Sequence, residues 1–213
     1  MSASMKSRDR NLNSAEMTLW TIQSPEAVRL LEKNGTLVSS NKMVFAPFRS
    51  SYKWMASQMR ERIGDPLNKS TPPLWAWHTY WDDSPRPDLR RTGHLSRGER
   101  AARIEFTVAP SNVLLSDFML WHYVLNYVYL SKSAKEEREF SRSLREHGLE
   151  SCITRPLPSR VLDERIKASW VRIFEIGKMF TRDGNVRAGQ CIQATLWALQ
   201  LESVKKIDWF TAR

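Results

Sequence analysis

Three side chains that could hold a ligand follow one another along one side of a segment near the carboxyl end. The stretch GQCIQATLWALQLE, Gly189 to Glu202, has the alternation of a β-strand, which places Gln193, Thr195 and Trp197 on the same side. The opposite side is apolar, with isoleucine, alanine and leucine in turn. An amide, a hydroxyl and an indole in one row are typical of a ligand cleft, where a few polar groups stand among apolar ones.

A second candidate is a run of arginines in the middle of the chain. Between residues 85 and 103 six arginines stand against two carboxylates, at positions 86, 90, 91, 97, 100 and 103. Guanidinium groups grip phosphate through two parallel hydrogen bonds and also stack on bases. The proline and glycine content predicts a loop. We interpret it as a clamp for nucleic acid or polyphosphate, formed by Arg86, Arg90, Arg97 and Arg100. The alternative is a surface loop whose arginines pair with carboxylates elsewhere.

Asp117, His122 and Asn126 form a third group, in an otherwise apolar stretch. On a helix, His122 and Asn126 lie one turn apart on the same face. These side chains could line the ligand cleft and orient a ligand, or Asp117 and His122 could act together in a nuclease-like toxin. The alternative is that Asp117 caps a helix while the other two are core residues with satisfied hydrogen bonds.

The sequence lacks the common signatures of metal and P-loop enzymes. It has no glycine-rich phosphate loop, no HExxH motif, no CxxC pair and no GxSxG elbow. Its four histidines are scattered without ligand spacing. We therefore expect no metal in the site.

Composition favours a polyanionic partner. The 213 residues carry a formal net charge of +10 and include nine tryptophans. Cations follow phosphate and flat rings stack on bases, so this balance is typical of nucleic-acid binding, although core tryptophans and solubilising lysines would give the same totals. Trp54 and Trp170 lie on apolar helix faces and are interpreted as core.

The elements that must position these residues are short strands interspersed with helices. We expect strands over residues 17–23, 36–38, 74–81, 103–108, 189–202 and 206–213. Helices are expected over residues 25–34, 47–64, 118–130, 133–148 and 159–180, with Ser24 and Gly35 bounding the first and a capping box of Ser133 and Glu136 opening the fourth. This order predicts a single α+β domain over residues 17–213.

The remaining segments point to a cytoplasmic protein. Residues 1–16 are polar and aperiodic, which predicts a disordered tail without a signal peptide. The most apolar window, residues 113–130, is interrupted by Ser116, Asp117, His122 and Asn126 and therefore favours a buried helix over a membrane span. Two cysteines are too few for a disulfide framework.

Several segments together resemble a bacterial family of unknown function whose members open on a Leu-Trp-Thr-Ile-Gln strand: LWTIQ, SPEAVRLLEKNGTL, LWAWHTYW, IEFTV, VLLSDF, WHYVLN and IQATLW. The resemblance covers nearly all of Met17 to Arg213. At longer range the layout resembles the ADP-ribosyltransferases, especially the nucleic-acid-modifying toxins of the DarT type. This implies a split sheet of short strands with flanking helices, and NAD as co-substrate.

The resemblance also implies roles for individual residues. Gln193, Ala194 and Thr195 match a Gln-Ala-Glu segment whose glutamate is catalytic in that family, and Thr21 falls near its first-strand histidine or arginine. Thr195 carries no charge, so the role of the carboxylate would pass to Asp117 or Glu202. Taking the residues and the resemblance together, we expect NAD to be bound by Trp20, Thr21, Gln23, Tyr52, Trp75, Trp77, Arg91 and Trp197, and the catalytic group to be Gln193 and Thr195 with Asp117 and His122.

These observations predict an NAD-dependent ADP-ribosyltransferase that modifies RNA or DNA, as the toxin of a toxin–antitoxin or phage-defence system. Three alternatives stay open. The chain could be a non-catalytic nucleic-acid-binding module on a decayed transferase scaffold, a protein that binds an acidic partner such as an antitoxin, or the nuclease-like toxin described above.

Overall fold

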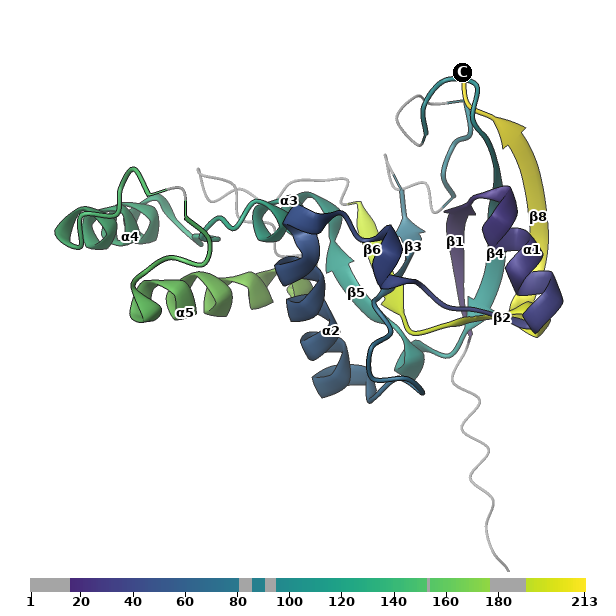
Figure 1. Ribbon diagram of the computed structural model, residues 1–213, viewed down its shortest axis with the longest axis horizontal. Helices are drawn as coiled ribbons and strands as arrows, with labels where there is room; N and C mark the ends of the chain where they lie inside the picture. Colours follow the sequence, from purple (N-terminus) through teal and green to yellow (C-terminus); the bar gives the residue numbers. More distant parts are fainter. Residues whose placement is uncertain (1–15, 81–85, 91–94, 153, 177–190) are drawn as a thin grey trace, which may run out of the picture.

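The computed structural model describes residues 16–80, 86–90, 95–152, 154–176 and 191–213. They form a single α+β domain in which a sheet lies at one end and a group of helices at the other (Figure 1). The tail expected over residues 1–16 lies outside the described residues, apart from Glu16.

The main sheet has six strands in the order β5-β6-β3-β1-β4-β8, and every pairing is antiparallel. The strands are β1 (Met17–Gln23), β3 (Leu74–Thr79), β4 (Arg100–Val108), β5 (Leu114–Asp117), β6 (Ile192–Leu196) and β8 (Val204–Thr211). A small second sheet pairs β2 (Thr36–Leu37) with β7 (Leu199–Gln200).

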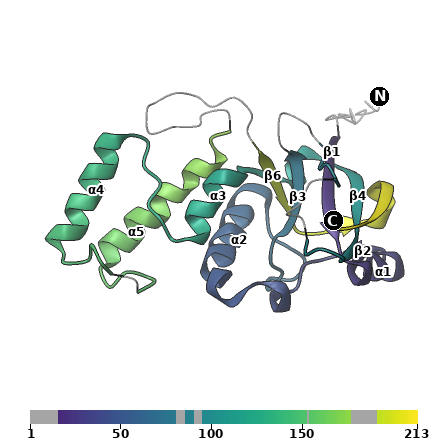
Figure 2. The ribbon, with the colours of Figure 1, turned by 90° about the horizontal axis from the view of Figure 1, so that it is seen from above.

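Five α-helices flank the sheet or extend from it: α1 (Pro25–Asn34), α2 (Arg49–Ile63), α3 (Phe118–Leu125), α4 (Ala134–Glu146) and α5 (Arg160–Ser169). Short 3-10 turns link them: η1 (Asn41–Met43), η2 (Ala46–Phe48), η4 (Pro110–Asn112), η5 (Trp170–Phe174) and η6 (Leu201–Ser203). Figure 2 shows α4 and α5 extending away from the sheet, beyond α3.

The first helix forms as its local sequence predicts. The Ser24 hydroxyl accepts a hydrogen bond from the Ala27 amide at 3.2 Å, and Pro25 opens α1. Gly35 ends the helix at φ 70°, a left-handed conformation that glycine adopts without a side-chain clash. Val28 and Leu31 are buried against the sheet. The predicted strand over residues 17–23 is confirmed to the residue as β1.

Two apolar cores lie on opposite sides of the sheet. One packs α1 and the small sheet against the strand residues Leu19, Ile104, Phe106 and Ala194. The other joins α2, α3, α5 and η5 around buried residues that include Met55, Met59, Trp121, Ile166 and Trp170. The interpretation of Trp170 as core is confirmed, and Trp54 packs edge-on against it.

Two predicted helices are shorter than expected. The helix expected over residues 118–130 ends at Leu125, because Tyr127 adopts a left-handed backbone at φ 57°. There its hydroxyl contacts Asp163 and accepts a bond from the Leu157 amide at 3.1 Å. The helix expected over residues 159–180 is α-helical only to Ser169 and continues as η5. Residues 177–180 lie outside the described range.

Two other boundaries also differ. The arginine-rich loop ends sooner than predicted, because β4 begins at Arg100, where β8 offers Thr211 as a partner. The strand expected over residues 189–202 is β6 followed by β7, since the Trp197 indole N–H turns to the Gly64 carbonyl at 2.9 Å.

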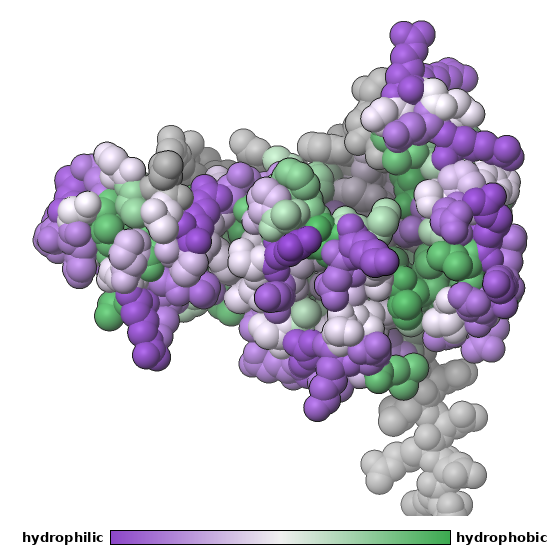
Figure 3. Space-filling model, in the orientation of Figure 1, coloured by the Kyte–Doolittle hydropathy of each residue, from purple (hydrophilic) through white to green (hydrophobic). Residues whose placement is uncertain are grey.

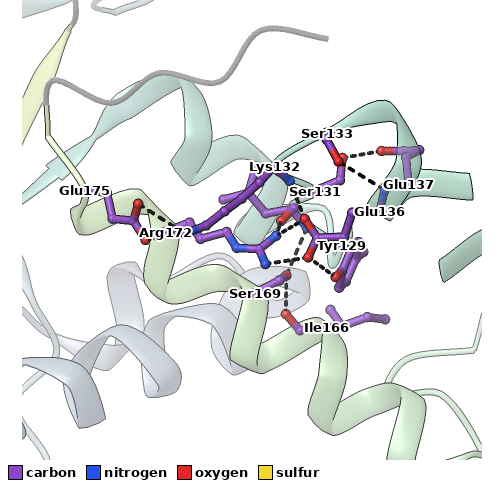
Figure 4. Close-up of polar contacts among 11 residues, drawn as sticks. Tyr129, Ser131, Lys132, Ser133, Glu136, Glu137, Ile166, Ser169, Arg172 and Glu175 are labelled. Carbon is purple, nitrogen blue, oxygen red and sulfur yellow. Dashed lines mark hydrogen bonds and ion pairs between the residues drawn. The ribbon is translucent and has the colours of Figure 1, made fainter. Parts of the chain in front are cut away.

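Glu136 ties α4 to η5 (Figure 4). Its carboxylate accepts bonds from both Arg172 guanidinium nitrogens, at 2.5 and 3.1 Å, from the Tyr129 hydroxyl at 2.6 Å and from the Lys132 amide at 2.7 Å. The Ser133 half of the predicted capping box is confirmed, with its hydroxyl accepting from the Glu136 amide. The Glu136 side chain, however, turns to Arg172 instead of back to the cap.

Candidate functional site

Six residues form one row across the whole main sheet, which we call the polar row. The register pairs Ser116 with Gln193, Gln193 with Trp77, Trp77 with Trp20, Trp20 with Glu105, and Glu105 with Lys206. Residues directly opposite each other on neighbouring strands project to the same face. The sheet therefore places Trp20, Trp77 and Gln193, all predicted site residues, on a common face.

The polar row crosses a weak junction in the sheet. Within the described residues, β1 pairs with β4 along its full length but with β3 only at Trp20 and Trp77. Beside this pair, the Thr21 hydroxyl donates to the Trp75 carbonyl at 2.8 Å and accepts from the Gln23 amide at 2.8 Å. Strand alternation places Thr21 and Gln23 on the face opposite the polar row. These two residues were predicted to contact NAD, but they stabilise the β1–β3 junction from the other face of the sheet.

Glu105 is a residue of this face that sequence reasoning missed. Its carboxylate accepts a hydrogen bond from the Trp20 indole N–H at 3.1 Å, and Glu105 is half-buried while Trp20 is buried. Alternation within β4 indicates only that Glu105 projects away from the apolar core. That it stands beside two tryptophans follows from the register between strands distant in sequence, which a single sequence does not carry.

Gln193 is the most exceptional member of the row. It is 9% exposed, and its side-chain oxygen has no hydrogen-bond partner in the described part of the chain. The hydroxyl of Ser116, opposite it on β5, is likewise buried and unpaired. An unpaired buried polar group costs about 1–3 kcal/mol. Both atoms are sealed from solvent, so a ligand group could bond to them and recover that energy only after neighbouring side chains move.

Gln193 and Thr195 share one face of β6, as the sequence predicted, but Trp197 lies beyond the strand. Thr195 is fully buried, and its hydroxyl donates to the Leu114 carbonyl at 3.1 Å inside the sheet. Trp197 lies beyond the end of β6, in the lining of a separate cavity of about 540 Å³. The expectation of three ligand-facing side chains on one strand is therefore corrected for two of them: the Thr195 hydroxyl bonds to the neighbouring strand, and the Trp197 indole lies at another surface.

Asp117, His122 and Asn126 are also separated. Asp117 is 2% exposed and caps α3 by accepting from the Leu120 amide at 2.9 Å, and burial raises the pKa of its carboxyl. His122 and Asn126 share a helix face, as predicted, but both are exposed and bond to backbone carbonyls of α3, so neither is a core residue. The structure does not bring Asp117 and His122 together as an acid–base pair.

Tyr52, Trp75 and Trp121 form a three-ring cluster between α2, β3 and α3, with centroids 4.9–5.9 Å apart. Burial raises the pKa of the Tyr52 hydroxyl. Trp77 packs instead against Phe118 and Tyr80, both at 4.9 Å. The two tryptophans of β3 therefore have different roles: Trp75 packs helices α2 and α3 against the sheet, and Trp77 belongs to the polar row.

Several arginines of the predicted clamp are engaged within the protein. Arg90 grips Asp88 at 2.9–3.2 Å, and Arg103 is 7% exposed and bonded to Asp208 and the Pro87 carbonyl, both at 2.6 Å. The Arg100 guanidinium lies 5.0 Å from the centre of the Trp209 ring. Arg86 and Arg90 line a hollow of about 510 Å³ with Asp88, and Arg97 is exposed. Arg91 lies outside the described residues.

The described residues contain neither a cluster that could hold a metal ion nor a helix that could span a membrane. No group of three or more histidine, cysteine, aspartate or glutamate side chains there is arranged to hold a metal ion. No helix among them has both the length and the hydropathy needed to cross a membrane.

Comparison with known proteins gives a family for the chain. No curated protein and no solved structure matches it. A family model described as a domain of unknown function, DUF3841, matches residues 18–205, which is most of the sequence and nearly all of the described fold. The chain therefore belongs to the DUF3841 family.

Proposed function

We propose that this protein is an NAD-dependent ADP-ribosyltransferase that modifies RNA or DNA and acts as the toxin of a toxin–antitoxin or phage-defence system. The observation that carries the proposal is the polar row, which crosses the β1–β3 junction of an otherwise well-paired sheet. The split sheet implied by the resemblance to transferases of the DarT type would open at this junction. The toxin role rests on that resemblance alone.

The row supplies the groups that the reaction needs. The bond between ribose C1′ and the nicotinamide nitrogen breaks, and nicotinamide leaves with the bonding electron pair. A nucleophile of the nucleic acid then bonds to C1′ and gives up a proton. The transition state resembles an oxocarbenium ion, which a nearby carboxylate stabilises. Glu105 is the carboxylate of the polar row, and the Trp20 indole N–H orients it.

The remaining roles follow from position. Gln193 would bond the hydroxyls of the second ribose of NAD, the one attached to adenine, through its unpaired oxygen, and Trp77 and Trp20 lie between the two polar ends. Strands lie about 4.8 Å apart, so Gln193 and Glu105, three strands apart, span roughly 14 Å, enough for a ligand with linked ring systems. Thr195 and Asp117 keep structural roles in this assignment.

The test is incubation of the purified protein with NAD labelled in its ADP-ribose part, together with mixed RNA or DNA. We expect label on the polymer and free nicotinamide in equal amounts. Glu105→Gln should abolish both while Glu202→Gln, an exposed carboxylate outside the row, should leave them unchanged. Absence of label and of nicotinamide release with every polymer would sink the proposal.

A non-catalytic nucleic-acid-binding protein is the second candidate. The observation in its favour is Thr195, which replaces the glutamate of the resembling family and is sealed inside the sheet. This candidate predicts salt-dependent binding of RNA or DNA without any release of nicotinamide, so the same assay separates the two.

A further inference from the structure

A basic cleft lies outside the polar row, along α2. It has a volume of about 710 Å³ and is lined by residues of α2, of η1 and its neighbour Val44, and of the turn before β3: Asn41, Lys42, Val44, Arg49, Tyr52, Lys53, Ala56, Arg60, Lys69, Ser70, Thr71 and Pro72. Five of these are lysine or arginine and none is a carboxylate. Figure 3 shows hydrophilic side chains gathered over α2 and the chain beside it.

The cations of the cleft differ from those of the arginine-rich segment. Lys42, Arg49, Lys53 and Lys69 are exposed, and the described residues provide no carboxylate within ion-pair distance of them. Arg60 is the exception, with Asp65 3.7 Å away. Four like charges around one hollow repel one another and favour an anionic ligand.

Hydrogen bonds hold the walls of the cleft in place. The Asn41 side-chain amide donates to the Ser70 carbonyl at 2.7 Å, which joins η1 to the turn before β3. Arg60 donates to the Lys69 carbonyl at 2.8 Å, which joins that turn to α2. The Asn68 side chain accepts from both the amide and the hydroxyl of Ser70. A cleft with walls tied in this way has its shape before a ligand arrives.

Large exposed apolar side chains adjoin the lining residues in the sequence. Met43 and Phe45 stand on either side of Val44, which lines the cleft, and are 83% and 65% exposed. Phe45 is steadied by an edge-on contact with Phe48 at 5.5 Å. Exposed rings next to cations suit unpaired bases, which stack on any flat face.

We propose that this cleft binds the sugar-phosphate backbone of single-stranded nucleic acid, with Arg49 and Lys53 contacting phosphates and Phe45 stacking on a base. Its volume lies within the range of small-ligand sites, about 300–1,000 Å³, so it admits one or two nucleotides of a flexible strand but not a stiff duplex. Tyr52 lines the cleft and packs on Trp75 of β3, which places a bound strand beside the main sheet.

The experiment measures fluorescence anisotropy of labelled single strands, one DNA and one RNA of the same sequence, over a series of salt concentrations and without NAD. For Arg49→Gln/Lys53→Gln, we expect the slope of log affinity against log salt to shrink by about 1.4, because each phosphate contact on a single strand contributes about 0.7. If the two proteins bind equally at 1 M salt, this equals a loss of about 25-fold in affinity at 0.1 M. Phe45→Ala should weaken binding without changing the slope.

The matched control is Arg90→Gln/Arg97→Gln, which removes the same charge from the arginine-rich segment. It should change the slope by less than half as much. An equal or larger effect of the control would overturn the cleft as the binding surface. So would a DNA duplex that binds as tightly as the single strand, or full displacement of the strand by stoichiometric pyrophosphate. Because NAD is absent from this experiment, a failed transferase assay leaves its result standing.

Discussion

The indole N–H of Trp20 on β1 donates to the carboxylate of Glu105 on β4, at 3.1 Å, across one of the best-paired strand contacts of the sheet. A hydrogen bond to a charged group contributes about 1.5–3 kcal/mol, and here it also fixes the direction in which the carboxylate points. The pair therefore links the stability of the sheet to the proposed chemistry.

Trp20→Phe keeps an aromatic ring at this buried position but removes the N–H together with the five-membered ring that carries it. We expect nicotinamide release to fall on the order of ten-fold, while the free energy of unfolding falls by about 1.5–3 kcal/mol. Trp209→Phe, on the exposed face of β8, serves as the control and should change neither quantity. Turnover and urea denaturation of the same preparations provide the measurement. Unchanged turnover in Trp20→Phe would remove the orienting role.

Gln193→Leu should lower NAD affinity without lowering the stability of the protein. Because the glutamine oxygen has no partner in the described residues, an apolar side chain of similar size should leave the free energy of unfolding unchanged or raise it by about 1 kcal/mol. NAD affinity, measured by calorimetry, should fall at least about ten-fold with the loss of one hydrogen bond. A variant that loses stability and keeps its affinity would show that Gln193 is a structural residue.

Thr195→Val tests whether the buried hydroxyl has a role beyond the sheet. The substitution leaves the Leu114 carbonyl without its side-chain donor, which should cost about 1–2 kcal/mol of stability. NAD affinity and transfer rate should stay at the level of the unsubstituted protein once the assay temperature is well below the melting temperature. A specific loss of transfer would return Thr195 to the catalytic group that the sequence predicted.

Because of Glu136, we expect the free energy of unfolding to decrease in acid. Burial raises the pKa of this carboxyl, but hydrogen bonds from Arg172, Tyr129 and the Lys132 amide outweigh burial and lower it to about 2, from 4.5. A lowered folded-state pKa stabilises the protein above the unfolded value, so this contribution is complete above about pH 4.5 and is lost as the pH falls towards 2.

Glu136→Gln should therefore lower the free energy of unfolding at pH 7 by about 1–3 kcal/mol, and it should flatten the dependence of stability on pH below 4.5. Glu139→Gln is a control on the same helix, because its ion pair with Lys135 is exposed and long, at 3.9 Å. Chemical denaturation across pH 2–7 checks both variants. Parallel pH profiles of Glu136→Gln and the unsubstituted protein would contradict the assignment.

Features whose signals lie within a few residues could be predicted from the sequence. Ser24, Pro25 and Gly35 bound α1 because caps and left-handed glycines act locally. The bounds of β1 follow in the same way from its own alternation. Where a distant partner intervened, prediction failed: Trp197 leaves the strand for the Gly64 carbonyl, and Arg100 enters β4 because Thr211 is there to pair with it.

The candidate sites were predicted less completely, for the same reason. The sequence predicts Trp20, Trp77 and Gln193 as site residues on three separate strands. Only the register between the strands places them in one row with Glu105. The basic cleft left a partial signal: Arg49, Lys53 and Arg60 recur at spacings of four and seven, which is one face of a helix. Lys42 and Lys69 reach that face only through the folded turns on either side of α2.

The single pair of Trp20 and Trp77 divides the main sheet into two panels, β5-β6-β3 and β1-β4-β8. Each panel has longer ladders of its own, with one register shift in the β3–β6 pair and one in the β4–β8 pair, so the line between the panels is where thermal fluctuations should concentrate. The two panels can then rotate relative to each other about a hinge along that line, and each panel keeps its internal hydrogen bonds. Amide hydrogen exchange should accordingly be faster along the shared edges of β1 and β3 than along the ladder between β4 and β8.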